Sequence, residues 1–209
     1  MPVQELDVFV NCPFDAAYKP IFNAIVFVVT RSGFRVRCAL EADNAADNRF
    51  EKICSIIAEC RFGIHDISRT EPDAGSGLPR FNMPLELGLY LGARRFGGKA
   101  QKGKACIVFD RAPYRYQQFI SDIAGQDIHS HAGEVRTLIR ELATWLRMQP
   151  GKAVTPGGIA MIAEYATFET VLPTNCAARS LEPDELAFTD FNDIVTEYVA
   201  TLKVVPAGP

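Results

Sequence analysis

The sequence lacks the features by which a chain binds nucleic acid or enters a membrane. Its 22 lysines and arginines are outnumbered by 25 acidic residues, and no basic run is present that could follow a phosphate backbone. The most apolar stretch, residues 21–29, is about half as long as a membrane span. Glu5 and Asp7 stand where the apolar core of a signal peptide would lie. We therefore expect a cytoplasmic protein with no nucleic-acid or membrane partner.

Metal and serine-hydrolase signatures are also missing. None of the six cysteines forms a C-x-x-C pair, and only three histidines occur. This composition argues against a zinc site and predicts no metal and no bound cofactor. No G-x-S-x-G motif is present, so a serine hydrolase finds no support.

What the sequence does contain is a regular alternation of strand and helix patterns. Short apolar runs predict strands, which fall at residues 6–10, 34–40, 61–67 and 104–110. Amphipathic or buried repeats predict helices, which fall at residues 18–31, 50–60, 82–95, 116–123 and 134–148. For residues 18–31 the β-branched composition favours a strand, but the length and the apolar repeat favour a helix. This order predicts an α/β fold with a parallel sheet flanked by helices.

The pattern changes near residue 150. Pro150-Gly151 and Pro156-Gly157-Gly158 interrupt it, and the residues beyond are more acidic than those before. Only helical signals follow, at residues 159–171 and 190–204. We therefore expect an α/β domain over residues 1–150 and a helical extension over residues 151–209. The extension has apolar stripes and should pack on that domain or on a partner subunit.

Ligands of open α/β sheets bind beyond the carboxyl ends of the strands, so the residues that follow the strands are the candidates for a site. These candidates are Asn11, Phe14, Asp15, Glu41, Asp43, Asp66, Ser68, Asn82, Glu86 and Asp110. The set is rich in carboxylates and lacks a glycine-rich phosphate loop. Such acids suit ribose hydroxyls, or a positive charge that develops on a sugar during reaction.

Two of these carboxylates have simpler structural interpretations. The role of Glu86 could be purely structural, as a residue that stabilises the first turn of its helix. Asp66 could likewise do no more than cap the turn after its strand. Against the first interpretation stand Gly88 and Gly92, which are costly inside a helix and usually allow a close approach to a neighbouring element. Cys12 could be a reactive thiol, although a buried thiol is more common.

Two stretches resemble known families. Phe9-Val10-Asn11-Cys12-Pro13-Phe14-Asp15 resembles the first-strand motif of prokaryotic TIR-like proteins. Residues 58–68 followed by Asn82-Met83-Pro84-Leu85-Glu86-Leu87-Gly88 resemble a pattern that TIR-like domains share with nucleoside 2-deoxyribosyltransferase-like proteins. The resemblance covers about residues 6–148 and implies a flavodoxin-like fold.

The resemblance also implies a chemistry, which is cleavage or transfer at an N-glycosidic bond. It assigns Glu86 as the catalytic carboxylate and a substrate pocket to Asn11, Phe14, Asp15, Asp66, Ser68 and Asn82. The leading expectation is a homo-oligomeric enzyme that consumes NAD as its substrate in bacterial anti-phage defence, with other defence-system proteins as candidate partners. One alternative is a deoxyribosyltransferase or nucleoside hydrolase. Another is a non-catalytic nucleotide-sensing or scaffold module, because the tryptophan that precedes the glutamate in many TIR domains is absent.

Overall fold

The computed structural model describes residues 2–41, 44, 46, 48–72, 75, 77–150 and 154–202. Its centre is a parallel sheet with the strand order β2-β1-β3-β4-β5, which is the order of the flavodoxin-like fold. The predicted fold class is therefore confirmed. The strands are β1 (Gln4–Asn11), β2 (Arg35–Arg37), β3 (Cys60–Asp66), β4 (Ala105–Asp110) and β5 (Ile128–Ser130).

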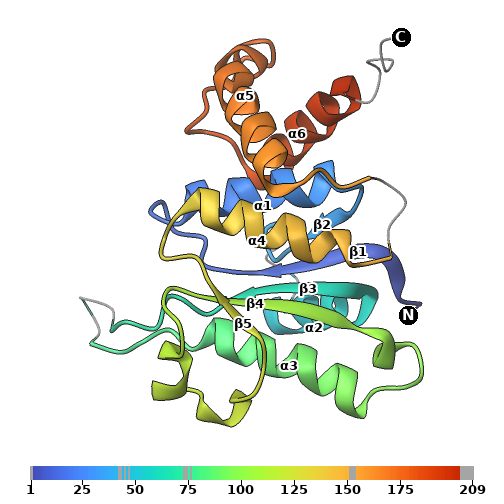
Figure 1. The fold of residues 1–209 in the computed structure, drawn as a ribbon, viewed down its shortest axis with the longest axis vertical. Coiled ribbons are helices and arrows are strands. Elements are labelled where there is room, and N and C mark those ends of the chain that lie inside the picture. The colour runs from blue at the N-terminus through green and yellow to red at the C-terminus, as the bar shows by residue number, and fades with distance from the viewer. Residues whose placement is uncertain are drawn as a thin grey trace.

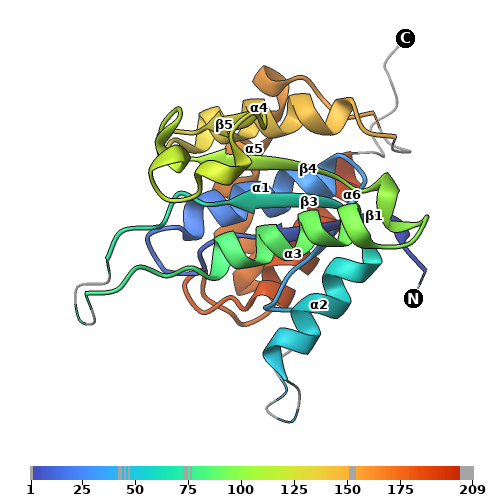
Figure 2. The same ribbon diagram turned by 90° about the horizontal axis from the view of Figure 1, so that it is seen from below.

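Helices cover both faces of this sheet and add a further layer on one side (Figure 1). The helices of the α/β part are α1 (Lys19–Arg31), α2 (Arg49–Glu59), α3 (Asn82–Phe96) and α4 (Val135–Arg147). Those of the extension are α5 (Gly158–Ala177) and α6 (Phe188–Leu202). Helices α1 and α4 lie on one face, and α2 and α3 lie on the other, which is turned toward the viewer in Figure 2. Helices α5 and α6 lie outside α1 and α4, so the extension never touches the sheet's second face.

Helix α1 is enclosed between two layers, which explains its unusual composition. Eight consecutive or near-consecutive residues between Ile21 and Val29 are buried. Its inner face packs on the sheet, and Phe27 on its outer side has ring contacts with Tyr165, Phe168 and Tyr198 of α5 and α6. A helix that is apolar all round must be buried all round. The packing therefore overrides the β propensity of this segment.

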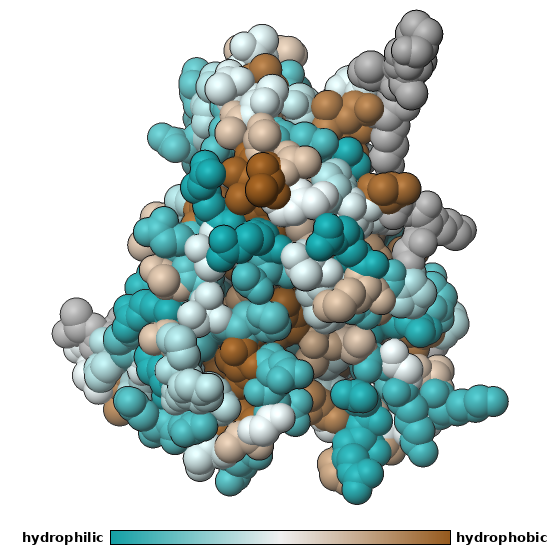
Figure 3. All heavy atoms as spheres, viewed as in Figure 1, coloured by the Kyte–Doolittle hydropathy of each residue, from teal (hydrophilic) through white to brown (hydrophobic). Residues whose placement is uncertain are grey.

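The extension shares one continuous hydrophobic core with the α/β part. Met161, Phe168, Ile194 and Val195 are completely buried in the same cluster as residues of β1, β3 and α4. An ion pair between Arg31 Nε and Glu164 Oε2, 2.6 Å apart, closes the edge of this contact. The face shown in Figure 3 is mostly polar, with hydrophobic side chains scattered singly or in small groups, because the apolar sides of α5 and α6 face inward.

Four segments differ between the prediction and the structure. The segment at residues 34–40 forms only the three-residue strand β2, and residues 116–123 form two short 3₁₀ helices, Arg115–Gln118 and Ser121–Ile123, in place of one α-helix. No strand is predicted at residues 128–130, yet this polar segment pairs with β4 as the edge strand β5. Helix α5 continues through Pro173 to Ala177, past the predicted end at residue 171, because the buried Cys176 holds its last turn in the core. Residues 203 and 204, the predicted end of the last helix, lie outside the described residues.

A further prediction, that Gly88 and Gly92 permit a close approach, is wrong. A Cβ atom at either position would meet no atom within 4 Å. The close approach occurs instead on β3, where a Cβ at Gly63 would lie 2.7 Å from His65 Nε2 and 3.0 Å from the Tyr90 ring. None of the helices in the described part of the chain combines the length and hydropathy that crossing a membrane requires.

The shared core predicts that a cavity in α5 destabilises the whole fold. Phe168→Ala should lower the free energy of unfolding by about 3–5 kcal/mol, because it removes a completely buried ring. The melting temperature, followed by circular dichroism, should fall by roughly 10 °C in a single transition. Phe96→Ala is the matched control, since Phe96 is 87% exposed on α3 and should change little. An unchanged main transition in Phe168→Ala would show that the extension is energetically separate.

Candidate functional site

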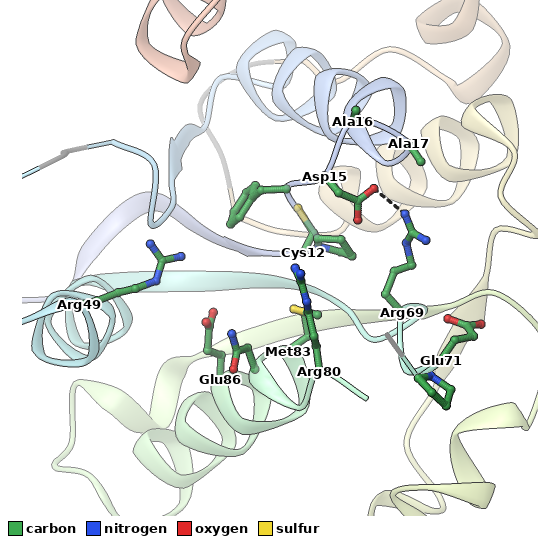
Figure 4. Close-up of a pocket in the computed structure, with 14 residues that line it drawn as sticks. Cys12, Asp15, Ala16, Ala17, Arg49, Arg69, Glu71, Arg80, Met83 and Glu86 are labelled. Carbon is green, nitrogen blue, oxygen red and sulfur yellow. Dashed lines mark hydrogen bonds and ion pairs between the residues drawn. The ribbon is translucent and has the colours of Figure 1, made fainter. Parts of the chain in front are cut away.

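A cavity of about 730 Å³ opens at the carboxyl ends of β1 and β3, between the start of α1 and the start of α3. Its volume lies within the range of small-molecule sites. Figure 4 shows side chains from several segments converging on it. The described residues that line it are Cys12, Pro13, Phe14, Asp15, Ala16, Ala17, Arg49, Arg69, Glu71, Pro72, Arg80, Asn82, Met83 and Glu86.

Glu86 lies on α3 with its carboxylate directed into this cavity (Figure 4). It is the fifth residue of the helix, and α3 has no acidic residue in its first turn, so the alternative of a helix-capping role is wrong. No hydrogen-bond donor from the described residues reaches the carboxylate. Burial therefore raises the pKa of Glu86 to about 7, although the positive charge of Arg49 opposes this shift in part. A half-buried carboxylate without donors in a cavity is typical of functional sites.

Three of the other predicted residues also line the cavity. Phe14 is 37% exposed, and Asn82 is exposed at the beginning of α3. Asp15 accepts a hydrogen bond from the Tyr18 backbone N–H and forms an ion pair with the Arg69 guanidinium. The sheet-edge argument thus places these three residues beside Glu86.

Asp66 and Ser68 lie behind the cavity wall, in a buried network. Asp66 is completely buried, and its carboxylate accepts hydrogen bonds from the Tyr18 hydroxyl and, at 2.8 Å, from the Ser68 backbone N–H. His131 Nε2 lies 2.9 Å from Asp66 Oδ2, although it is not aligned for a hydrogen bond. The Ser68 carbonyl accepts a hydrogen bond from Arg115. Neither residue is among those that line the cavity, and both connect the loops that surround it.

Asn11 is likewise buried and does not line the cavity. Its Nδ2 donates a hydrogen bond to the Met83 carbonyl at 2.9 Å and lies 3.1 Å from His65 Nδ1. The Met83 bond fixes the beginning of α3 to the end of β1, and so it positions the helix that carries Glu86. Of the two acids that follow β2, Glu41 pairs with Arg37, and Asp43 lies outside the described residues.

The arginines of the cavity were not predicted. Arg49 begins α2, and Arg69 and Arg80 lie in the loop between β3 and α3. Arg80 forms no ion pair with any described residue, and Figure 4 shows its side chain extending into the cavity. Guanidinium groups bind phosphate through paired N–H donors. A search for any cation near the strand ends would have found Arg69, which follows β3 directly, but Arg49 and Arg80 lie more than ten residues beyond the preceding strand.

Cys12 lies at the cavity but is almost completely buried. Burial raises the pKa of its thiol, and the nearby Asp66 carboxylate raises it further, so Cys12 is not a thiolate nucleophile at neutral pH. His65 is buried between Phe9 and Tyr90, and burial lowers its pKa to about 3. Among the residues that the structure describes, no group of three or more His, Cys, Asp or Glu side chains could hold a metal ion.

Comparison of the chain with models of known protein families, with curated proteins and with solved structures gave no match.

The burial of Glu86 predicts that its ionisation lowers the free energy of unfolding. Because the folded-state pKa is raised from 4.5, the contribution of Glu86 to folding is fully present below about pH 4.5 and is lost as the pH rises through about 7. Glu86→Gln, which removes the ionisation, should therefore be more stable than the parent protein at pH 8 by on the order of 2 kcal/mol. That difference corresponds to several degrees in melting temperature and should disappear near pH 4.5.

The matched control is Glu134→Gln, which removes the same charge from an exposed position. It should change the free energy of unfolding by less than about 0.5 kcal/mol at either pH. Equal stability of Glu86→Gln and the parent at pH 8 would mean that the ionised carboxylate is fully hydrated and that its burial costs no stability.

Proposed function

We propose that this chain is a TIR-like enzyme that cleaves the N-glycosidic bond between nicotinamide and ribose in NAD. The observation that carries the proposal is the Glu86 carboxylate, which is directed into the cavity, accepts no hydrogen bond from a described residue and shares the cavity with three arginines. The position of Glu86 also corresponds to the glutamate of the motif that the sequence resembles. The flavodoxin-like order of the sheet supports this correspondence.

Cleavage of this N-glycosidic bond requires one carboxylate from the protein and no general acid for the leaving group. When the bond between C1′ and the nicotinamide nitrogen breaks, its electron pair goes to the nitrogen, which loses its positive charge. The leaving group therefore needs no general acid. The positive charge moves to the sugar, where an oxocarbenium-like state forms, and a nearby carboxylate stabilises it. Water then adds to C1′, and its proton goes to Glu86 or to solvent.

The weak hydration of Glu86 is suited to this step. A half-buried carboxylate that accepts no hydrogen bond from a described residue gains more from a cation that develops beside it than a fully hydrated carboxylate would. The nicotinamide ring of bound NAD is itself cationic, so it should lower the pKa of Glu86 and favour the ionised form in the complex. Binding of NAD would thus favour the ionised form of Glu86, which is the form that the reaction requires.

Incubation with NAD tests the proposal. The purified protein should release nicotinamide, detected by liquid chromatography, and Glu86→Gln should reduce the rate at least about a hundredfold while the protein stays folded. Glu134→Gln should retain the parent rate. The assay should include high protein concentrations, because TIR-like domains often act as assemblies. No nicotinamide release at any concentration would contradict the proposal, and base exchange between deoxynucleosides would indicate the deoxyribosyltransferase chemistry.

The pH profile gives an independent check. The ionised form of Glu86 is the active form, and its pKa in the free protein is about 7. Since the ionised fraction rises about tenfold between pH 6 and pH 8, kcat/KM for NAD should rise by about the same factor. The profile of kcat should be shifted to lower pH, because the bound substrate is cationic. A kcat/KM that falls with pH over this range would assign a different, acidic role to Glu86.

A further inference from the structure

A second, smaller cavity adjoins the first one. It has a volume of about 190 Å³, below the range of sites that hold a whole drug-sized molecule. Its wall is largely apolar and comes from α1, from the segment after β2 and from the C-terminal extension. The apolar side chains that line it are Phe14, Phe22, Leu40, Leu186, Phe188 and Phe191.

The extension completes this cavity, which the α/β part alone would leave open. Leu186 precedes α6, and Phe188 and Phe191 belong to it. The Phe188 ring lies 5.9 Å from the Phe22 ring of α1, and the Phe22 ring lies 5.2 Å from that of Phe14. The series of rings therefore runs from the extension to the larger cavity.

A cation fastens the loop that leads to this wall. Lys19 Nζ donates hydrogen bonds to the carbonyls of Pro183 and Asp184, each at 3.4 Å. These bonds attach the segment before α6 to the beginning of α1. The Lys19 bonds therefore add to the contact between the Phe188 and Phe22 rings in holding Leu186 and Phe188 over the cavity.

The two cavities are continuous at the beginning of α1. Phe14, Asp15 and Ala16 line both of them. Asp15 also carries the ion pair with Arg69, which lines the larger cavity together with Arg80 and Glu86 (Figure 4). The apolar cavity therefore adjoins the cavity that holds both Glu86 and the arginines.

We propose that the smaller cavity binds the second, distal base of the dinucleotide whose reactive ribose lies at Glu86. The inference rests on the proposed function and adds a role for the C-terminal extension, which supplies Leu186, Phe188 and Phe191 to the base site. A planar aromatic base matches a small cavity with aromatic walls, since it gains from stacking and from edge-to-face contacts. The phosphates that join the two nucleosides would lie in the larger cavity, where Arg69 and Arg80 supply donors.

Binding of AMP and of ribose 5-phosphate tests the base site directly. AMP carries the base and ribose 5-phosphate lacks it, so the ratio of their dissociation constants isolates the contribution of the base. Titration calorimetry on the full chain should show that AMP binds at least about tenfold more tightly than ribose 5-phosphate. Phe188→Ala should reduce this ratio to about one, and Leu186→Ala should reduce it in part.

Tyr198→Ala is the matched control, because Tyr198 is another partly buried aromatic residue of α6 that packs on Phe27 and Phe168 and does not line the smaller cavity. It should preserve the ratio even where it lowers the melting temperature. A parent protein that gains nothing from the base, or a ratio that survives in Phe188→Ala, overturns the inference.

Turnover separates this inference from the proposed function. If NAD is cleaved, Phe188→Ala should raise KM for NAD about tenfold and leave KM for nicotinamide mononucleotide, which lacks the second base, unchanged. Cleavage of NAD with an unaltered KM in Phe188→Ala would overturn the base site while the proposed function stands. If the parent does not cleave NAD, the proposed function fails, and the AMP ratio still decides whether the base site exists.

Discussion

The buried carboxylate of Asp66 is the group on which the architecture of the site depends. It ends the central strand β3, and its removal from water costs several kcal/mol unless donors compensate it. Those donors are the hydroxyl of Tyr18, next to α1, and the backbone N–H of Ser68, with His131 in contact from the segment after β5. One carboxylate thus brings together the loops that follow three strands. The cavity residues on these loops take their positions from a group that does not itself reach the cavity.

Asp66 and Glu86 are two carboxylates of the same sheet edge in opposite environments. The structure satisfies Asp66 with donors, whereas no described residue donates a hydrogen bond to Glu86, so burial is the main influence on the pKa of Glu86 and the charge of Arg49 opposes it only in part. Such a division of environments is how one scaffold can hold a structural acid and a reactive acid close together. Asn11 contributes to the division as well, because its bond to the Met83 carbonyl sets where α3 begins and hence where Glu86 points. The buried contacts of Asp66 and Asn11 therefore also position Glu86 at the cavity.

The alternation of apolar segments was enough to predict the parallel sheet and its helices, because apolar residues repeat with one period in strands and with another in helices. It did not reveal β5, whose three half-buried residues at the sheet edge carry too little apolar pattern. The sheet-edge rule likewise found Glu86, Asp15, Phe14 and Asn82, but it could not separate them from Asp66, Ser68 and Asn11. All seven lie at or beyond the end of a strand, and whether such a side chain turns to the cavity or to the interior depends on donors that come from distant loops. Arg49 and Arg80 were not predicted for a related reason. Both lie more than ten residues beyond the preceding strand, and the path of the chain between cannot be read from its composition.

The enclosure of α1 has a consequence for how the chain is made. Residues 19–31 leave the ribosome more than a hundred positions before residues 158–202, which cover their outer face. At ordinary rates of synthesis the delay is on the order of ten seconds, far longer than helix formation or collapse requires. During this interval the nascent α/β part carries an uncovered apolar stripe, which is the kind of surface that chaperones bind and that aggregates recruit. The completion of the fold is therefore timed by translation of the extension, and any pause between α4 and α5 prolongs the period of exposure.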